Sequence, residues 1–200
     1  MLEKVAELPP SIPTLKGAVS DLLREGADRF ILPRFQNLFA QDIDTKSSET
    51  DFVTIADREA EAWLAPRLFE AQAGFIIGEE AAAISPRIRD QIPAGYSWTI
   101  DPLDGTKNFV RGKPAFCSMV ALLWNGQPIE CWIWQPLVKI LFYASVTQKL
   151  HTEFAHASHL EWPHSTLQTL SPISCSNFLE DGYVLSLIHI SEPTRQEASS

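Results

Sequence analysis

A twelve-residue stretch at positions 98–109, WTIDPLDGTKNF, constrains the fold of this chain more than any other. It opens with aromatic and β-branched residues, which favour a strand, and because a residue before proline is held extended, we predict that this strand ends at Asp101. Asp101 and Asp104 would then follow a strand end, and the Leu103 carbonyl between them could turn the same way, since proline offers no N–H. Such a turn is rich in the oxygen ligands that Mg²⁺ prefers.

The next two residues add features of a phosphate site. Gly105 lets the backbone approach a ligand closely, and Thr106 brings a hydroxyl and an N–H group to the predicted start of a short helix. A plain polar β-turn also uses Asp, Pro and Gly, so the segment DPLDG alone leaves both interpretations open.

Acids also stand at two element ends upstream. The apolar run 75–77 indicates a second strand, and Glu79 follows it within Gly-Glu-Glu. Asp57 begins a helix expected over 55–71 and stands three residues after Thr54, which is the spacing of a capping box. Asp57 therefore has a structural role open to it as well as a catalytic one. Three element ends that each carry acids indicate a site for more than one metal ion.

Taken in order, these motifs resemble those of the inositol monophosphatase-like, Mg²⁺-dependent, lithium-sensitive phosphatases. The resemblance runs from about Leu15 to about Val146 and rests on four matches, which are Lys46-Ser47-Ser48, DFVTIAD at 51–57, GEE at 78–80 and WTIDPLDGTKNF. It implies an α+β or α/β layered sandwich of the sugar phosphatase type, in which an N-terminal helix pair packs on a largely antiparallel sheet and a second α/β half is missing.

The resemblance also implies a site that binds two or three Mg²⁺ ions and is inhibited by Li⁺. Its metal ligands would be Glu79, Asp101, the Leu103 carbonyl, Asp104 and Asp57. The implied reaction is hydrolysis of a phosphate monoester by metal-activated water, without a covalent enzyme intermediate.

The remaining roles implied by the resemblance concern the attacking water and the phosphate. Asp57, Glu79 and Thr106 would be catalytic, and Asp104, Gly105 and Thr106 would bind substrate. Lys46 is a further candidate, in a loop expected over 41–50, although a solvated lysine would suit such a loop equally well.

Several functions stay open within this interpretation. Inositol-1-phosphate is the first expected substrate, while the segment 105–112, GTKNFVRG, leans toward histidinol phosphate, and 3′(2′),5′-bisphosphate nucleotides are a further alternative in the family. A catalytically incompetent metal- or phosphate-binding fragment is the non-enzymatic alternative. The haloacid-dehalogenase phosphatases are excluded, because Pro102 stands where their nucleophilic aspartate would be.

The net charge and the cysteine content limit the kinds of partner and the location that we expect for this protein. The formal net charge of −9 argues against binding to nucleic acid or to an anionic membrane. No stretch reaches the length of about 18 apolar residues that a membrane span needs, and the three cysteines form no CxxC pair. We expect a cytoplasmic protein that acts on a small phosphorylated metabolite and, as is common in the family, forms a homodimer.

The other expected elements are simple. They are a helix from 15 that Pro33 kinks or ends, a surface loop over 81–95, strands over 116–124, 129–134 and 140–146 with a turn at Asn125-Gly126, and a polar histidine-containing surface segment after them.

The end of the chain suggests an interrupted protein. We expect an N-terminal phosphatase domain over 1–150, an incomplete second half over 151–184, and a non-native tail over 185–200, because LSLIHISEPTR at 185–195 resembles a translated sequencing adapter. The Trp-Asp motif that carries a further metal ligand in the family is absent from the sequence. The full-length parent is therefore expected to be active, and this chain weakly active or inactive.

Overall fold

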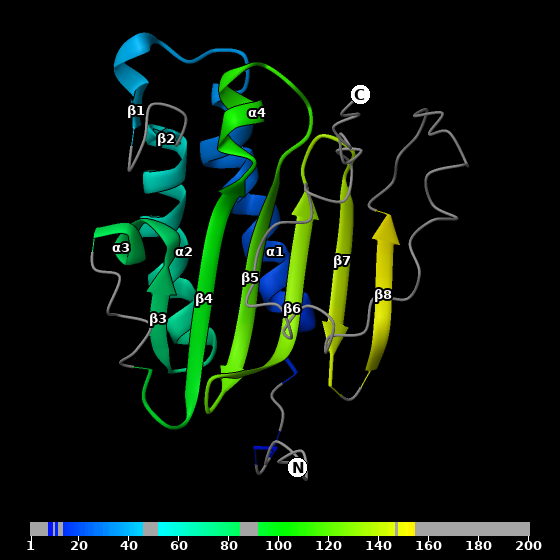
Figure 1. The fold of residues 1–200 in the computed structure, drawn as a ribbon. Helices are drawn as coiled ribbons and strands as arrows, with labels where there is room; N and C mark the ends of the chain where they lie inside the picture. The colour runs from blue at the N-terminus through cyan, green and yellow to red at the C-terminus, as the bar shows by residue number, and fades with distance from the viewer. Residues whose placement is uncertain are drawn as a thin grey trace, which may run out of the picture.

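The computed structural model describes residues 8–9, 11, 14–45, 52–84, 92–146 and 148–154. In this part of the chain a six-stranded sheet, in the order β3-β4-β5-β6-β7-β8, carries the two long helices α1 and α2 on one face (Figure 1). A separate sheet of two short strands, β1 and β2, lies near one end of the larger sheet (Figure 1). This is the helix pair on a mostly antiparallel sheet that the sequence predicted.

One end of each long helix follows a feature of the local sequence. Helix α1 spans Lys16–Gly26 and continues through a π-helical turn, Ala27–Ile31, and a 3₁₀ turn, Leu32–Arg34, so the predicted stop at Pro33 is confirmed. Helix α2 spans Ile55–Ala71 and opens with the predicted capping box. There the Thr54 hydroxyl accepts the Ala56 N–H at 3.2 Å, and the Asp57 carboxylate accepts the Thr54 N–H at 2.8 Å.

The large sheet is parallel at one edge and antiparallel elsewhere. Its strands are β3 (Phe75–Gly78), β4 (Tyr96–Asp104), β5 (Cys117–Trp124), β6 (Gln127–Gln135), β7 (Ile140–Ser145) and β8 (Gln148–Phe154). Only the β3–β4 pair is parallel. Asn125 and Gly126 join β5 to β6 with φ values of 50° and 77°, as a two-residue hairpin turn requires, so the predicted meander is confirmed.

The sequence missed four elements. Strands β1 (Ile43–Thr45) and β2 (Phe52–Thr54) pair antiparallel, partly within the predicted loop over 41–50. Helix α3 (Glu79–Ile84) enters the predicted loop over 81–95, and β8 lies where a polar surface segment was expected. Edge strands and one-turn helices are held by backbone hydrogen bonds, which need no apolar periodicity, so composition does not reveal them.

The main core fills the space between the two helices and the sheet. Trp98 and Trp132 are fully buried there, with ring centroids 6.1 Å apart, and Leu64 of α2 packs in the same cluster. The Trp98 ring N–H donates to the Gln72 carbonyl at 2.9 Å, which satisfies its polar atom. Trp98 and Trp132 are thus core residues.

The opposite face of the sheet carries a smaller apolar cluster, formed by Cys117, Met119 and Ile133 with Phe142 packed against it. Cys117 is buried and Cys131 half-buried, and both are free thiols. No helix among the described residues is long and apolar enough to cross a membrane. Strand β8 runs across residue 150, where the first domain was expected to end, while the division into domains itself stays a prediction.

Candidate functional site

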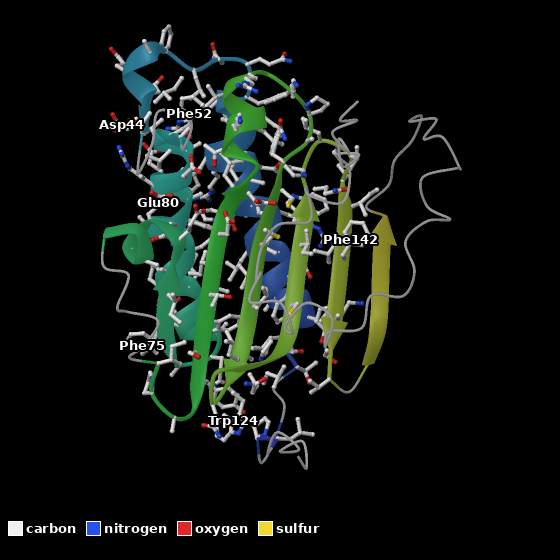
Figure 2. The ribbon with its side chains drawn as sticks, in the orientation of Figure 1. Asp44, Phe52, Phe75, Glu80, Trp124 and Phe142 are labelled. Atoms are coloured by element: carbon white, nitrogen blue, oxygen red, sulfur yellow. The ribbon has the colours of Figure 1, made fainter. Side chains whose placement is uncertain are left out.

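The predicted site residues gather at one end of the sheet. Strands β3 and β4 are parallel neighbours with Gly78 opposite Ile100, so the next residues of each strand, Glu79 and Asp101, stand side by side. In Figure 2, Phe75 and Trp124 mark the far end of the sheet, whereas Asp44 and Phe52 of the small sheet mark the near end, where α2 begins. Two strand ends and one helix start therefore converge, as the sequence predicted.

An irregularity in β4 releases the backbone between the two aspartates from regular strand pairing. Asp101 pairs with Met119 of β5, and the next pairing joins Asp104 to Cys117, so Pro102 and Leu103 drop out of the ladder. The prediction that the strand ends at Asp101 is therefore wrong, because the strand resumes at Asp104. The prediction failed because proline interrupts the hydrogen-bond ladder without ending it, as at a bulge.

Gly105 and Thr106 turn the chain from β4 into the short helix α4 (Thr106–Val110). Gly105 has φ 88° and ψ 28°, a left-handed conformation that glycine adopts without strain. The Thr106 hydroxyl lies 3.1 Å from Asp57 Oδ1 and 2.9 Å from the Leu103 carbonyl. Because one hydroxyl has a single proton, it donates to one of these acceptors at a time, and it ties α2 to the β4 irregularity.

Burial governs the charge state of the two innermost acids. Asp57 is fully buried, and burial raises its pKa to about 6, against the opposing hydrogen bonds from Thr54. Asp101 is 4% exposed, and its pKa is raised well above the usual range by burial first, and then by the negative charges of Glu79 and Asp104. Both acids are therefore costly to ionise unless a cation is near.

The donor set at this end of the sheet fits a hard cation. Its side-chain donors are carboxylate oxygens, and the Leu103 carbonyl lies among them. The side chains of Glu79 and Asp101 hydrogen-bond to each other, and this contact adds to the rise in the pKa of Asp101. Among the described residues, no three His, Cys, Asp or Glu side chains are yet grouped as a complete metal site.

The family follows from comparison with known sequences. Residues 16–179 match the model of the inositol monophosphatase family, which is well over half of the chain. The chain belongs to this family.

Individual members of the inositol monophosphatase family agree in sequence and fold. The histidinol-phosphatase of Mycobacterium tuberculosis is 39% identical over 107 residues, which cover 53% of this chain and 38% of that protein. The inositol-1-monophosphatase of Mycobacterium leprae is 34% identical over 128 residues, or 60% of this chain and 44% of that protein. The IMPase of Thermotoga maritima, a solved structure, is 25% identical with a TM-score of 0.59, over 70% of this chain and 50% of that one. The chain thus spans half or less of the length of these relatives.

Sequence reasoning missed two residues beside the candidate site. Cys117 points its thiol at Asp104 Oδ2 at 3.7 Å. Glu61 of α2 accepts the Glu80 N–H at 2.9 Å. Its position four residues after Asp57, on the same helical face, was the available signal. Lys46, the remaining candidate, lies outside the described residues.

Proposed function

We propose that the protein to which this chain belongs hydrolyses a small phosphate monoester with the help of Mg²⁺. The observation that supports this most directly is the convergence of four acids, Asp57, Glu79, Asp101 and Asp104, beside the left-handed turn at Gly105. Buried acids that repel one another are costly to a fold unless they bind a cation or a proton, so their presence favours a metal-dependent function.

The residues divide into two groups of metal ligands. Glu79, Asp101 and the Leu103 carbonyl would hold one ion, and Asp101 with Asp104 would hold a second. The Leu103 carbonyl can accept the Thr106 hydroxyl and still offer its other lone pair. Bound Mg²⁺ would supply Lewis acidity, which acidifies water and neutralises charge on the phosphate and the leaving group.

The attacking water would be held by Asp57 and Thr106. Their 3.1 Å contact orients the Asp57 carboxylate, and a pKa of about 6 leaves that group able to accept a proton near neutral pH. Glu79 would assist from the adjacent strand end. The N–H groups of Gly105 and Thr106, at the turn into α4, would bind the phosphate oxygens.

The substrate we favour is inositol-1-phosphate or a similar small phosphorylated metabolite. Histidinol phosphate is the main alternative, supported by the segment 105–112 and by the similarity to a histidinol-phosphatase. Bisphosphate nucleotides are a third candidate. We further propose inhibition by Li⁺, a homodimeric state and a cytoplasmic location, with neither nucleic acid nor membrane as partner.

The test compares two proteins made from the source gene, the 200-residue chain and the complete reading frame. Each is assayed for phosphate release from inositol-1-phosphate and histidinol phosphate with and without Mg²⁺. We expect Mg²⁺-dependent release by the complete protein and little or none by the 200-residue chain, which spans half or less of its relatives.

Asp101→Asn removes one ligand charge and should lower kcat/KM of the complete protein about 100-fold or more, because even residues that only support metal ligands cost 10–100-fold. Asp28→Asn is the control, since Asp28 is an exposed acid of the π-helical turn. Full activity of Asp101→Asn, or equal activity with and without Mg²⁺, would reject the proposal.

A further inference from the structure

Glu61 joins two helices that the candidate site needs. It lies on α2, one turn after Asp57, and its Oε2 accepts the backbone N–H of Glu80 at 2.9 Å. It also accepts the N–H of Ala81. Both N–H groups belong to the first turn of α3, where the helix itself offers no acceptor. A side chain of α2 therefore holds the start of α3.

Gly78 makes room for this contact. A Cβ atom at Gly78 would overlap the Glu61 carboxyl group and would lie 2.6 Å from its Oε2, closer than real Cβ atoms approach. The backbone of Gly78 is not in the left-handed region, so glycine is needed here for space. The carboxyl is the far end of a flexible side chain, so a methyl group at Gly78 would displace it from α3 while leaving β3 in place.

Glu79 stands between these two anchored residues. Its peptide is flanked by Gly78, which pairs with Ile100 of β4, and by Glu80, whose N–H is bound by Glu61. Glu79 in turn hydrogen-bonds to Asp101. Figure 2 labels Glu80 where α3 meets α2. Fixing the first turn of α3 thus fixes the direction in which Glu79 leaves β3.

Other acids near this junction do not offer the same link. Glu59 lies on another face of α2 and pairs with Arg34 at 2.6 Å. Glu70, near the end of α2, is exposed. Burial and the charges of Glu79 and Glu80 oppose ionisation of Glu61, whereas the two N–H groups favour it. Because Glu79 and Glu80 repel a charge on Glu61, the two hydrogen bonds from α3 are the contacts that favour a carboxylate at this position.

We propose that Glu61 is a positioning residue, which holds Glu79 toward Asp101 through the first turn of α3 and thereby sets the affinity of the site for its divalent cation. The inference rests on the proposed metal-dependent function. It adds a residue that touches neither metal nor substrate, and it explains the glycine of the Gly-Glu-Glu segment.

The test uses the protein of the complete reading frame, with Mn²⁺ alone as the probe and electron paramagnetic resonance as the readout of binding. Four variants are compared with the parent: Glu61→Ala, Glu61→Gln, Gly78→Ala and, as a control on the same helix, Glu70→Ala. Amide hydrogen exchange at residues 80 and 81 measures the anchor directly, and circular dichroism establishes that each variant is folded.

Glu61→Ala and Gly78→Ala should speed exchange at both amides and weaken Mn²⁺ binding about 10–100-fold, the range found for residues that orient metal ligands. Glu61→Gln keeps one acceptor oxygen and should fall between these variants and the parent, whereas Glu70→Ala should match the parent. If Glu61→Ala fails to fold, Gly78→Ala and Glu61→Gln still decide the outcome, because they leave an oxygen-bearing side chain at 61.

Faster exchange with unchanged Mn²⁺ affinity would show that Glu61 only stabilises α3, and would overturn the inference while leaving the proposed function intact. Unchanged exchange would overturn it as well. A parent chain that binds no Mn²⁺ would instead reject the metal-dependent function, and the inference with it.

Discussion

Glu130 of β6 is a buried acid that lies outside the candidate site. It is 2% exposed, its Oε1 accepts the hydroxyl of Tyr143 on β7, and its Oε2 has no hydrogen-bond partner among the described residues. Burial raises the pKa of Glu130 above its ordinary value of 4.5, against the lowering effect of the Tyr143 hydrogen bond. The folded state therefore holds the Glu130 proton more tightly than the unfolded state does.

This difference predicts a pH-dependent stability. Between pH 4.5 and the higher folded pKa, the folded state binds more protons than the unfolded state, so the free energy of unfolding falls as pH rises. Glu130→Gln cannot ionise and keeps an oxygen for the Tyr143 hydroxyl, so its stability relative to the parent should increase as pH rises from 4 to 8. Urea unfolding at several pH values measures this difference.

Asp28→Asn is the control for the pH series, because Asp28 is exposed. Its stability relative to the parent should not follow the trend of Glu130→Gln. A constant difference between Glu130→Gln and the parent across the range would contradict the raised pKa.

At the residue scale, the sequence predicted the candidate site residues that belong to a local motif. It did not predict those that approach the site from other elements. Asp101, Asp104 and Thr106 stand in one turn, so their convergence is visible in the chain itself. Cys117 and Glu61 approach the site from β5 and α2. The spacing of Glu61 from Asp57 places it on the same helical face, but no local pattern pairs Cys117 with Asp104 or Glu61 with the start of α3. The catalytic roles assigned to the acids stay predictions.

At the scale of an element, one glycine is required by its backbone conformation and another is not. Gly105 carries the turn into α4 with φ 88°, whereas Gly17 lies in the first turn of α1, where a methyl group would meet no atom within 4 Å. Gly105→Ala should lower the free energy of unfolding by roughly 1–2 kcal/mol, the cost of a left-handed non-glycine residue. Gly17→Ala should raise it by up to about 1 kcal/mol, because alanine favours helix.

Thermal unfolding of both alanine variants beside the parent measures these shifts. Gly17→Ala is the control for Gly105→Ala, since the same methyl group is added at both positions. A Gly105→Ala protein as stable as the parent would show that the turn relaxes without strain.

The elements that sequence predicted are those with strong local signals. Helix α2 has a capping box and an apolar face, and β5 to β7 have apolar runs with a clear turn, so all were found. Strand β1 and helix α3 are short and polar or charged, and each depends on a partner from elsewhere, β2 in one case and Glu61 in the other. Their existence is a tertiary effect, which single-sequence patterns do not carry.

At the scale of the whole molecule, we expect Mg²⁺ bound by the acids of the candidate site to stabilise the folded state. Binding to the folded state alone adds about 2.7 kcal/mol when the free ion is at 100 times its Kd. For a chain of this size that corresponds to several degrees in Tm. We expect the Tm to rise with Mg²⁺ concentration and the rise to be abolished in Asp101→Asn.

Differential scanning fluorimetry with MgCl₂ measures the shift, and NaCl at matched ionic strength is the control for screening. Equal shifts with the two salts would indicate a general electrostatic effect in place of a site.

The parallel pairing of β3 with β4 has a consequence for the order in which the molecule assembles. The hairpins from β5 to β8 join neighbours along the chain and close quickly, whereas the β3–β4 pair and the Thr106–Asp57 contact, which spans 49 residues, close larger loops. The acids thus come together only when these slower connections form. During folding, the antiparallel hairpins would form before the candidate metal site. The capacity to bind a cation would then signal that assembly is complete.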